Sequence, residues 1–265
     1  MAAEDEARTA ALRAAFDRIA PDYDRAGPGC FAHFGRVLVD AAGLEPGQRV
    51  LDVATGRGAV LLPAAERVGP AGDVLGIDLS PAMVEAAGAE AAARGLPVRL
   101  AVMDAARPAL DEAAFDHVLC GFGLMFLPAL DDALAGLVRA LRPGGRLTAS
   151  TWRTTQADDL QHVLPEAGAE IRALADPDAL ASALAGAGLA DVAVVESRAT
   201  FRYADLEDYW QCARGTGLRR IVDGLAPAAA DAVRAALATR VAGAVAADGS
   251  LALAASALIA TARRP

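Results

Sequence analysis

Short apolar runs alternate with segments of helical periodicity across the middle of the chain. Runs rich in Val, Leu, Ile and Ala predict five strands, at 49–54, 73–79, 98–103, 115–120 and 145–151. Amphipathic spacing predicts helices between them, at 59–68, 81–94 and 131–141. Because strands and helices alternate at this spacing, we expect a parallel sheet that helices cover on both faces.

Capping residues mark the boundaries of these units. Ser80 is a good N-cap residue, and Pro81 suits the first position of a helix. The run from Arg142 to Gly145, Arg-Pro-Gly-Gly, is expected to end a helix before the next strand begins. In an open parallel sheet, ligands bind beyond the carboxyl ends of the strands. The loops that follow the strands are therefore the places to search for a site.

Further helices and strands are expected on both sides of this core. Two N-terminal helices have apolar faces, which consist of Leu12, Phe16 and Ile19 and of Phe31, Phe34, Leu38 and Ala41. Downstream, the pattern predicts a helix at 178–187, a sixth strand at 191–195 and a final strand at 257–262. Between those strands, Asp205 is expected to cap a helix with an apolar stripe of Leu206, Tyr209, Trp210 and Ala213. A longer helix from about Pro227 has an apolar face of Val233, Leu237, Val241 and Val245.

The composition excludes several kinds of chemistry. The chain has 265 residues, a formal charge of −9 and a pI of about 4.9, and it contains neither Lys nor Asn. Without Lys there is no Schiff-base catalysis, no pyridoxal phosphate anchor and no P-loop lysine. The negative charge and the scattered Arg residues argue against a nucleic-acid partner.

Other features concern location and metal binding. The longest uncharged stretches, such as 118–130, fall short of the roughly 18 residues of a membrane span, and no basic leader opens the chain. Cys30, Cys120 and Cys212 are widely spaced, lack metal-ligand spacing and are typical of reduced thiols. We therefore expect a cytoplasmic protein without membrane association and without a bound metal.

A glycine-spaced turn follows the first predicted strand, in the segment VLDVATGRG from Val50 to Gly58. Glycines let the backbone approach a ligand closely, and the N-terminus of the following helix favours an anionic group. Leu61 stands where a dinucleotide fingerprint has a small residue, which argues against an NAD-dependent oxidoreductase. A tight turn whose glycines serve geometry alone is the other interpretation.

Carboxylates end the next two predicted strands. Asp78 follows Gly58 by 20 positions, where a carboxylate can accept hydrogen bonds from both hydroxyls of a ribose. Helix capping is the alternative for Asp78, although Ser80 already serves that purpose. Asp104, next to Met103, is placed to contact the edge of a base beside an apolar slot, or only to form a turn.

Together these segments resemble class I S-adenosylmethionine-dependent methyltransferases, and most of all the small-molecule branch with quinone C-methyltransferases and actinobacterial natural-product methyltransferases. The resemblance extends from Phe16 to Trp152, through FDRIAPDYD, VLDVATGRG, GIDLSPAMVE, Met103-Asp104, FDHVLCGFGLMFL and LRPGGRL. Beyond Trp152 it rests mainly on the closing segment ALIATARRP, which corresponds to the antiparallel seventh strand of the family. In the glycine turn, Ala54 replaces the usual first glycine.

The resemblance implies an α/β fold, a three-layer Rossmann-like sandwich with a seven-stranded, mostly parallel sheet. It implies N-terminal helices and a helical lid inserted before the last strand, although the inserted helices could equally form the face of a homodimer. The expected division is a helical cap at 1–45, a cofactor-binding core at 46–203, a lid at 204–250 and the final core strand at 251–265.

The resemblance also implies the residues that bind S-adenosylmethionine. Gly56 and Gly58 would pass under the methionine part, and Asp52 with the backbone near Ala54 and Gly121 would hold its ammonium and carboxylate groups. Asp78 would bind the ribose, and Tyr23 would close over the methionine end. Leu79 and Met83 would flank the adenine, whose amino group would meet Asp104 and whose edge would meet Ala105.

The expected activity is methyl transfer to a small, largely apolar acceptor in secondary metabolism. The first alternative is a protein of the same fold that binds the cofactor and catalyses another reaction, such as a cyclisation; an NAD-dependent oxidoreductase is the second. A hydroxyl acceptor needs a base, for which His162 and His33 are weak candidates, while His117 is expected to be structural. Acceptor contacts are expected from the first helices, from the region near Tyr209 and Trp210 and from Phe122, Met125 and Phe126, which could equally be core residues.

Overall fold

A seven-stranded sheet forms the centre of the computed structural model, which describes residues 2–25, 27–154, 173–214, 219 and 224–265. The strand order is β3-β2-β1-β4-β5-β7-β6; β1 to β5 are parallel, and β7 runs antiparallel to both of its neighbours. The strands are β1 (Arg49–Val53), β2 (Asp73–Asp78), β3 (Arg99–Val102), β4 (Phe115–Gly121), β5 (Leu141–Thr154), β6 (Ala190–Tyr203) and β7 (Leu251–Arg263). This is the predicted mostly parallel sheet with an antiparallel seventh strand.

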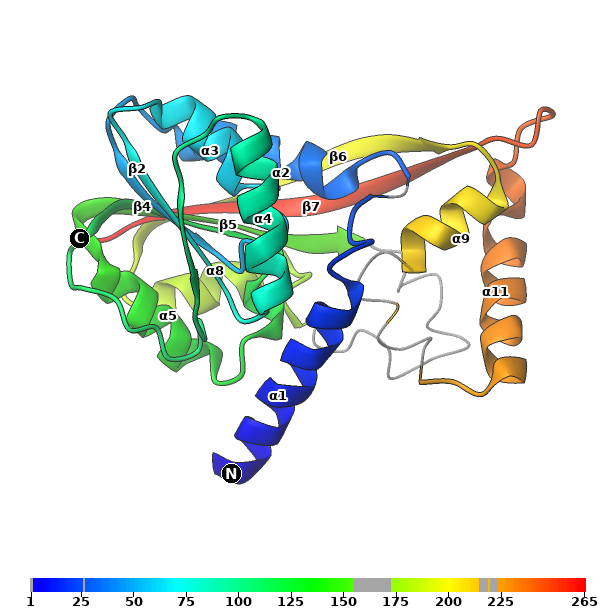
Figure 1. The fold of residues 1–265 in the computed structure, drawn as a ribbon, viewed down its shortest axis with the longest axis horizontal. Helices are drawn as coiled ribbons and strands as arrows, with labels where there is room; N and C mark the ends of the chain where they lie inside the picture. The colour runs from blue at the N-terminus through cyan, green and yellow to red at the C-terminus, as the bar shows by residue number, and fades with distance from the viewer. Residues whose placement is uncertain (1, 26, 155–172, 215–218, 220–223) are drawn as a thin grey trace.

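Helices cover both faces of this sheet (Figure 1). Their bounds are α1 (Ala2–Ile19), α2 (Cys30–Ala42), α3 (Leu61–Val68), α4 (Pro81–Ala93), η1 (Leu124–Phe126), α5 (Leu130–Ala140), α8 (Pro177–Gly186), α9 (Leu206–Arg214), α11 (Pro227–Val241) and η2 (Ala242–Ala244). Leu38, Leu61 and Ala87 place α2, α3 and α4 on one face, in a core with Val50. The helices α5 and α8 cover the other face, in a core that contains Leu51. The predicted three-layer sandwich is therefore confirmed.

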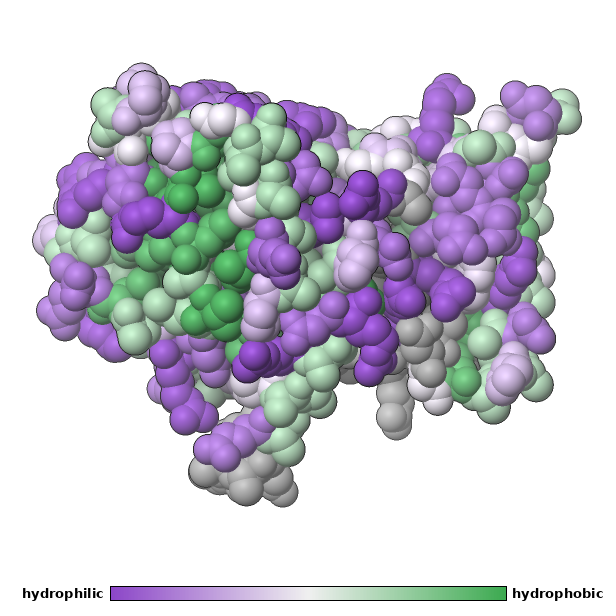
Figure 2. All heavy atoms as spheres, viewed as in Figure 1, coloured by the Kyte–Doolittle hydropathy of each residue, from purple (hydrophilic) through white to green (hydrophobic). Residues whose placement is uncertain are grey.

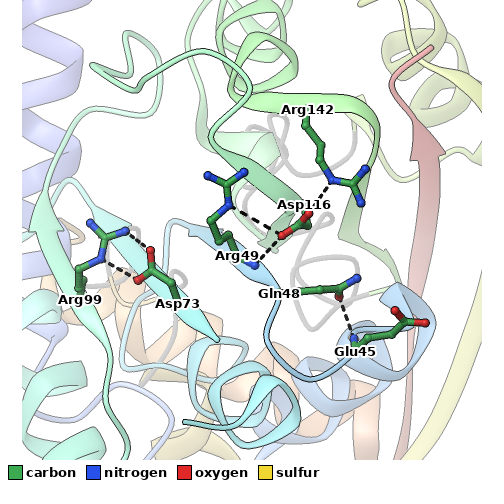
Figure 3. Close-up of polar contacts among 7 residues, drawn as sticks. All are labelled: Glu45, Gln48, Arg49, Asp73, Arg99, Asp116 and Arg142. Carbon is green, nitrogen blue, oxygen red and sulfur yellow. Dashed lines mark hydrogen bonds and ion pairs between the residues drawn. The ribbon is translucent and has the colours of Figure 1, made fainter. Parts of the chain in front are cut away.

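The amino ends of the parallel strands are joined by charged groups (Figure 3). Asp116 of β4 accepts hydrogen bonds from the backbone N–H of Arg49 in β1, at 2.7 Å, and from Nε of Arg142 in β5, at 2.5 Å. Burial alone would raise the pKa of Asp116, but these two partners hold it below its usual value. A bidentate pair between Arg99 and Asp73 joins β3 to β2. These polar contacts lie at the amino edge of the sheet. The opposite, carboxyl edge is where ligands bind in a sheet of this kind.

The last three strands are much longer than predicted. Because β6 and β7 pair from Ala190 and Arg263 to Tyr203 and Leu251, they extend past the end of β5 as a two-stranded ribbon. At the far end of this ribbon lie α9 and α11, which follow β6 and precede β7 in the chain (Figure 1). The insertion before the last strand is thus confirmed, whereas its role as a lid and the four-part division stay predictions.

Several local expectations need correction. The segment 142–145 does not separate a helix from a strand but lies inside β5. This strand begins directly after α5 ends at Ala140, and its register is irregular opposite Phe115. Ala41 is exposed, and its neighbour Ala42 is buried instead. Val245 is 44% exposed, because the helix ends at Val241 and the chain turns away from the apolar core. The other residues of that face, Val233, Leu237 and Val241, are buried as predicted.

The predicted helix caps are largely confirmed. The Ser80 hydroxyl accepts a hydrogen bond from the backbone N–H of Met83 at 3.1 Å, with Pro81 in the first turn of α4. Asp205 accepts one from the backbone N–H of Asp208 at 2.8 Å and so caps α9. The apolar stripe of α9 packs inward, with Tyr209, Trp210 and Ala213 buried.

The described surface is mostly hydrophilic, with an apolar area beside α4 in the view of Figure 2. Val102 on the edge strand β3 is 50% exposed. Among the residues that the structure describes, no helix combines the length and apolar character needed to cross a membrane.

Gly35 lets α2 lie directly on the turn after β1. A Cβ at this position would be 2.1 Å from the carbonyl oxygen of Ala59, and backbone cannot move aside as a flexible side chain can. We expect Gly35→Ala to lower the free energy of unfolding by about 3 kcal/mol, at the upper end of overpacking costs. Urea denaturation measures this. Gly186→Ala, where a Cβ would have no atom within 4 Å, is the matched control and should change stability by less than about 1 kcal/mol.

Candidate functional site

A cavity of about 320 Å³ lies at the carboxyl ends of β1, β2, β3 and β4, within the size range of small-molecule sites. Five separate segments of the chain bring all of the implied cofactor residues to its wall: Tyr23, Asp52, Ala54, Gly56, Gly58, Asp78, Leu79, Met83, Asp104, Ala105 and Gly121. The parallel register of the strands explains this convergence, since their carboxyl ends share one edge of the sheet.

The turn after β1 adopts left-handed backbone conformations at three alternate residues. The φ angles are 55° at Ala54, 53° at Gly56 and 95° at Gly58. For Ala54 this conformation costs about 1 to 2 kcal/mol, because its Cβ approaches the following carbonyl oxygen. Gly123 gives Ala54 its space, since a Cβ on Gly123 would lie 2.7 Å from that of Ala54. The replacement of the family's first glycine by Ala54 thus leaves the turn in a glycine-like conformation.

Asp78 holds this turn against the start of α4. Its carboxylate oxygens accept hydrogen bonds from the backbone N–H of Gly56 at 2.8 Å and from that of Ser80 at 2.9 Å. Burial raises the pKa of Asp78, and these two N–H groups oppose that rise. Asp78 therefore holds the N-cap residue in place, whereas the cap of α4 itself is the Ser80 hydroxyl.

Asp52 places a buried carboxyl group below the turn. It is 1% exposed, and its Oδ2 accepts a hydrogen bond from the Thr55 hydroxyl at 2.5 Å. Its Oδ1 is buried and has no hydrogen-bond partner among the described residues. Burial raises the pKa of Asp52 to about 7, while the Thr55 hydroxyl lowers it in part. A cation at this place would supply the missing partner and favour the ionised carboxylate.

Asp104 follows the end of β3. Its Oδ1 accepts a hydrogen bond from the backbone N–H of Ala106 at 2.9 Å, so the predicted turn interpretation is confirmed. Asp104 also lines the cavity beside Met103, with the fully buried Met83 in the same wall. A purine has hydrogen-bonding groups along its edge and two apolar faces. An acidic group next to apolar side chains is complementary to both.

The first helix is fastened over the cavity by contacts that sequence reasoning missed. Asp17 of α1 accepts hydrogen bonds from the Ser80 hydroxyl at 2.6 Å and from the Ala82 backbone N–H at 3.3 Å. Arg57, in the glycine turn, donates to the carbonyl oxygen of Ala20 at 2.8 Å and to Glu90 of α4 at 3.0 Å. The sequence feature that could have indicated these contacts is Arg57, which lies between two glycines of the predicted ligand-binding turn.

Aromatic side chains form the wall on the side of the N-terminal helices. Phe16, Tyr23, Phe31, Phe122 and Phe126 all line the cavity. Phe16 of α1 contacts Phe126 of η1 at a ring distance of 5.6 Å, so α1 and the segment after β4 meet there. Phe122, with a φ of 56°, stacks on Trp152 at 4.2 Å. Of the three residues considered after β4, Phe122 and Phe126 line the cavity, and Phe122 also belongs to the buried core that contains Met125.

The histidine candidates receive no support from this arrangement. His33 is absent from the described cavity wall, and its ring packs against Phe34 and Phe201. His117 is buried in β4, where burial lowers its pKa to about 4 and keeps the ring neutral, and it is absent from the described cavity wall. His162 lies outside the described residues. Tyr209 and Trp210 are buried in the core that α9 shares with α2, and neither is among the described lining residues.

Comparisons with known proteins agree with this geometry. A family described as a methyltransferase domain matches residues 50–145, which run from β1 into β5. Aklanonic acid methyltransferase of Streptomyces sp. (strain C5) is 46% identical over 134 residues, which cover 50% of this chain and 61% of that protein. Residues 50–145 thus match a methyltransferase domain family.

Two more comparisons define the extent of this likeness. Nocamycin O-methyltransferase of Saccharothrix syringae is 47% identical over 133 residues, which cover 50% of this chain and 48% of that protein. The chain thus spans about half to three fifths of the length of these two relatives. Phosphoethanolamine N-methyltransferase 2 of Haemonchus contortus, solved with S-adenosyl-L-methionine, has the same fold, with a TM-score of 0.59 and 19% identity over 90% of this chain and 54% of that chain.

The described residues include no candidate metal site. No group of three or more His, Cys, Asp or Glu residues among them is arranged to hold a metal ion.

Removal of the Asp78 carboxyl group is expected to weaken binding of S-adenosylmethionine to this protein. Asp78→Ala should cost about 1.5 to 3 kcal/mol of binding free energy, because the charge-assisted hydrogen bonds that Asp78 is predicted to accept from the ribose are lost together with its hydrogen bond from the glycine turn. Isothermal titration calorimetry measures the affinity. Asp73→Ala, at the other end of β2 and exposed, is the control and should bind normally. Unchanged affinity in a folded Asp78→Ala protein would place the ribose elsewhere.

The raised pKa of Asp52 predicts a pH-dependent stability of the ligand-free protein. In the unfolded chain this carboxyl group titrates near about 4, whereas burial raises its pKa to about 7 in the folded protein. The folded state therefore retains a proton that the unfolded state loses, and this contribution to stability disappears as the pH rises through 7. Relative to wild type, Asp52→Asn should become more stable as the pH is raised from 5 to 8. Urea denaturation across this range tests it, and a pH-independent difference would contradict it.

Proposed function

We propose that this chain transfers a methyl group from S-adenosylmethionine to an oxygen atom of a small, largely apolar secondary metabolite. The observation that carries the proposal is a single cavity with acidic strand ends on one side and aromatic rings on the other. A cationic cofactor suits the first part, and a flat apolar acceptor suits the second.

The residues present fit the cofactor. The unpartnered Oδ1 of Asp52 is a buried acceptor that an ammonium group would satisfy, together with the backbone near Ala54 and Gly121. Asp78 would bind the ribose hydroxyls at the tip of β2. When bound, S-adenosylmethionine supplies a methyl group on a positively charged sulfur.

The adenine would lie between Leu79 and Met83, with Asp104 and Ala105 at its edge. Gly56 and Gly58 would pass under the methionine part, and Tyr23 would cover it. Burial keeps the Tyr23 hydroxyl protonated by raising its pKa, so this group can donate a hydrogen bond at neutral pH.

Two observations support the acceptor class. The rings of Phe16, Phe31, Phe122 and Phe126 make the acceptor side of the cavity apolar and suited to stacking. In addition, the relatives that match half of this chain carry names of methyltransferases for aklanonic acid and nocamycin, the second an O-methyltransferase. The contribution of the protein to catalysis would be alignment of the acceptor and exclusion of water, which can supply about 7 to 11 kcal/mol in the best oriented cases.

An acceptor panel tests the proposed function. The wild-type protein is incubated with S-adenosylmethionine and aromatic polyketides or other pathway intermediates, and products are analysed by mass spectrometry. We expect one acceptor to gain the mass of a CH2 unit while S-adenosylhomocysteine appears in equal amount. Cofactor binding with an isomerised acceptor and no S-adenosylhomocysteine would favour the cyclisation alternative. Binding of NAD in place of S-adenosylmethionine would favour the oxidoreductase.

The predictions of a cytoplasmic location, of no nucleic-acid partner and of a homodimer face on the inserted helices stay predictions.

A further inference from the structure

Asp24 contributes a carboxyl group to the aromatic side of the cavity. It follows Tyr23 in the turn between α1 and α2, and both residues line the cavity. The Tyr23 ring lies 5.1 Å from that of Phe31, in the same wall. Arg57 of the glycine turn is near enough for its charge to act on Asp24. Asp24 thus lines the cavity next to the aromatic Tyr23 and is within electrostatic range of Arg57 in the glycine turn.

The other acidic residues in the described cavity wall either lie at the strand ends proposed to bind the cofactor, as Asp52, Asp78 and Asp104 do, or form ion pairs with arginine, as Glu66 and Glu90 do. Their partners are Thr55 for Asp52, Gly56 and Ser80 for Asp78, Ala106 for Asp104, Arg94 for Glu66 and Arg57 for Glu90. Within that described wall there is no His or Cys. Asp24 is therefore the best placed proton acceptor in the part of the cavity that the structure describes.

The surroundings of Asp24 suit a base that is ionised at neutral pH. Burial raises its pKa to about 6, while the backbone N–H groups of Phe31 and Ala32 and the charge of Arg57 keep it from rising further. The neighbouring titratable groups, Tyr23, Cys30 of α2 and Cys212 of α9, stay neutral because burial raises the pKa of each. A carboxylate of this basicity accepts a proton more readily than an exposed one.

We propose that Asp24 is the general base that accepts the proton of the acceptor hydroxyl during methyl transfer. This inference rests on the proposed function and deepens it, because it assigns the acceptor to the class of neutral hydroxyl compounds, phenols or enols. An acceptor that is already a carboxylate has no proton to give and would be repelled by Asp24.

The step balances in atoms and charge. The acceptor oxygen forms a bond to the methyl carbon as the bond between that carbon and sulfur breaks, and the bonding pair remains on sulfur. The hydroxyl proton passes to the Asp24 carboxylate. The products are the methyl ether, S-adenosylhomocysteine and a neutral Asp24, which then releases its proton to water.

A structural role for Asp24 is the competing explanation, because its carboxyl group lies at the first turn of α2, where it contacts the N–H groups of Phe31 and Ala32. Asn and Ser preserve hydrogen bonding at a helix N-terminus but cannot accept a proton from a hydroxyl. Asp24→Asn and Asp24→Ser therefore separate the two roles. Asp22→Asn is the matched control, since Asp22 lies in the same turn but its side chain is 69% exposed.

The main experiment measures kcat at saturating cofactor with the acceptor found in the panel. We expect Asp24→Asn to lower kcat by about 10²- to 10⁴-fold, the usual contribution of a general base. Calorimetry should show an unchanged affinity for S-adenosylmethionine, and Asp22→Asn should behave as wild type. The wild-type kcat should fall below about pH 6, as Asp24 becomes protonated, and this acid limb should be absent from Asp24→Asn.

Two further measurements distinguish a base from a structural residue. Derivatives of the acceptor with a more acidic hydroxyl should lose less activity in Asp24→Asn, because they ionise without help. With S-adenosylhomocysteine present, absorbance titration of the bound acceptor should give a higher hydroxyl pKa in wild type than in Asp24→Asn, since an ionised Asp24 disfavours the phenolate.

The outcomes separate the two proposals. If the wild-type protein methylates no acceptor, the proposed function fails and this inference fails with it. If wild type is active and Asp24→Asn retains its kcat and its acid limb, only the inference is overturned. Loss of cofactor binding in both Asp24→Asn and Asp24→Ser, or an equal loss of activity for all acceptor derivatives, would assign Asp24 a structural role and would also overturn it.

Discussion

The carboxyl group of Asp78 accepts one hydrogen bond from the turn after β1 and another from the start of α4. These two bonds place both loops at the carboxyl edge of the sheet in a fixed relation to the tip of β2. Ser80 extends the connection to Asp17 of α1, and Arg57 connects the same turn to Ala20. Helix α1, the glycine turn and the start of α4 therefore belong to one polar network. A shift of the glycine turn would displace α1 as well.

This network has an electrostatic cost that a cationic ligand would lower. Asp52 and Asp78 are both removed from water, and burial raises the pKa of each. Asp52 retains an oxygen without a partner in the described structure. A positively charged ligand would offset the desolvation cost of these two carboxyl groups. This offset would make binding of the proposed cofactor more favourable.

The side of the cavity that is proposed to hold the acceptor is shaped by apolar packing and not by hydrogen bonding. Phe122 adopts a left-handed φ and stacks on Trp152, which shares a core with α2, α9 and α11. The insertion thereby supports the aromatic wall from behind without contributing described lining residues. Asp24 brings a carboxylate to this apolar wall, where a proton acceptor has most effect.

Local sequence patterns were sufficient for the order and type of most elements, because apolar periodicity and capping residues act within a few positions. They also located the carboxylates at the strand ends, since Asp52, Asp78 and Asp104 occur at the ends of recognisable strands. The lengths of β5, β6 and β7 were beyond local patterns, because alanine-rich segments such as 251–256 show no clear period and their pairing decides their conformation. The contacts of Asp17, Arg57 and Asp24 depend on segments far apart in the chain that meet only after the sheet has formed, and for that reason the folded structure alone reveals them.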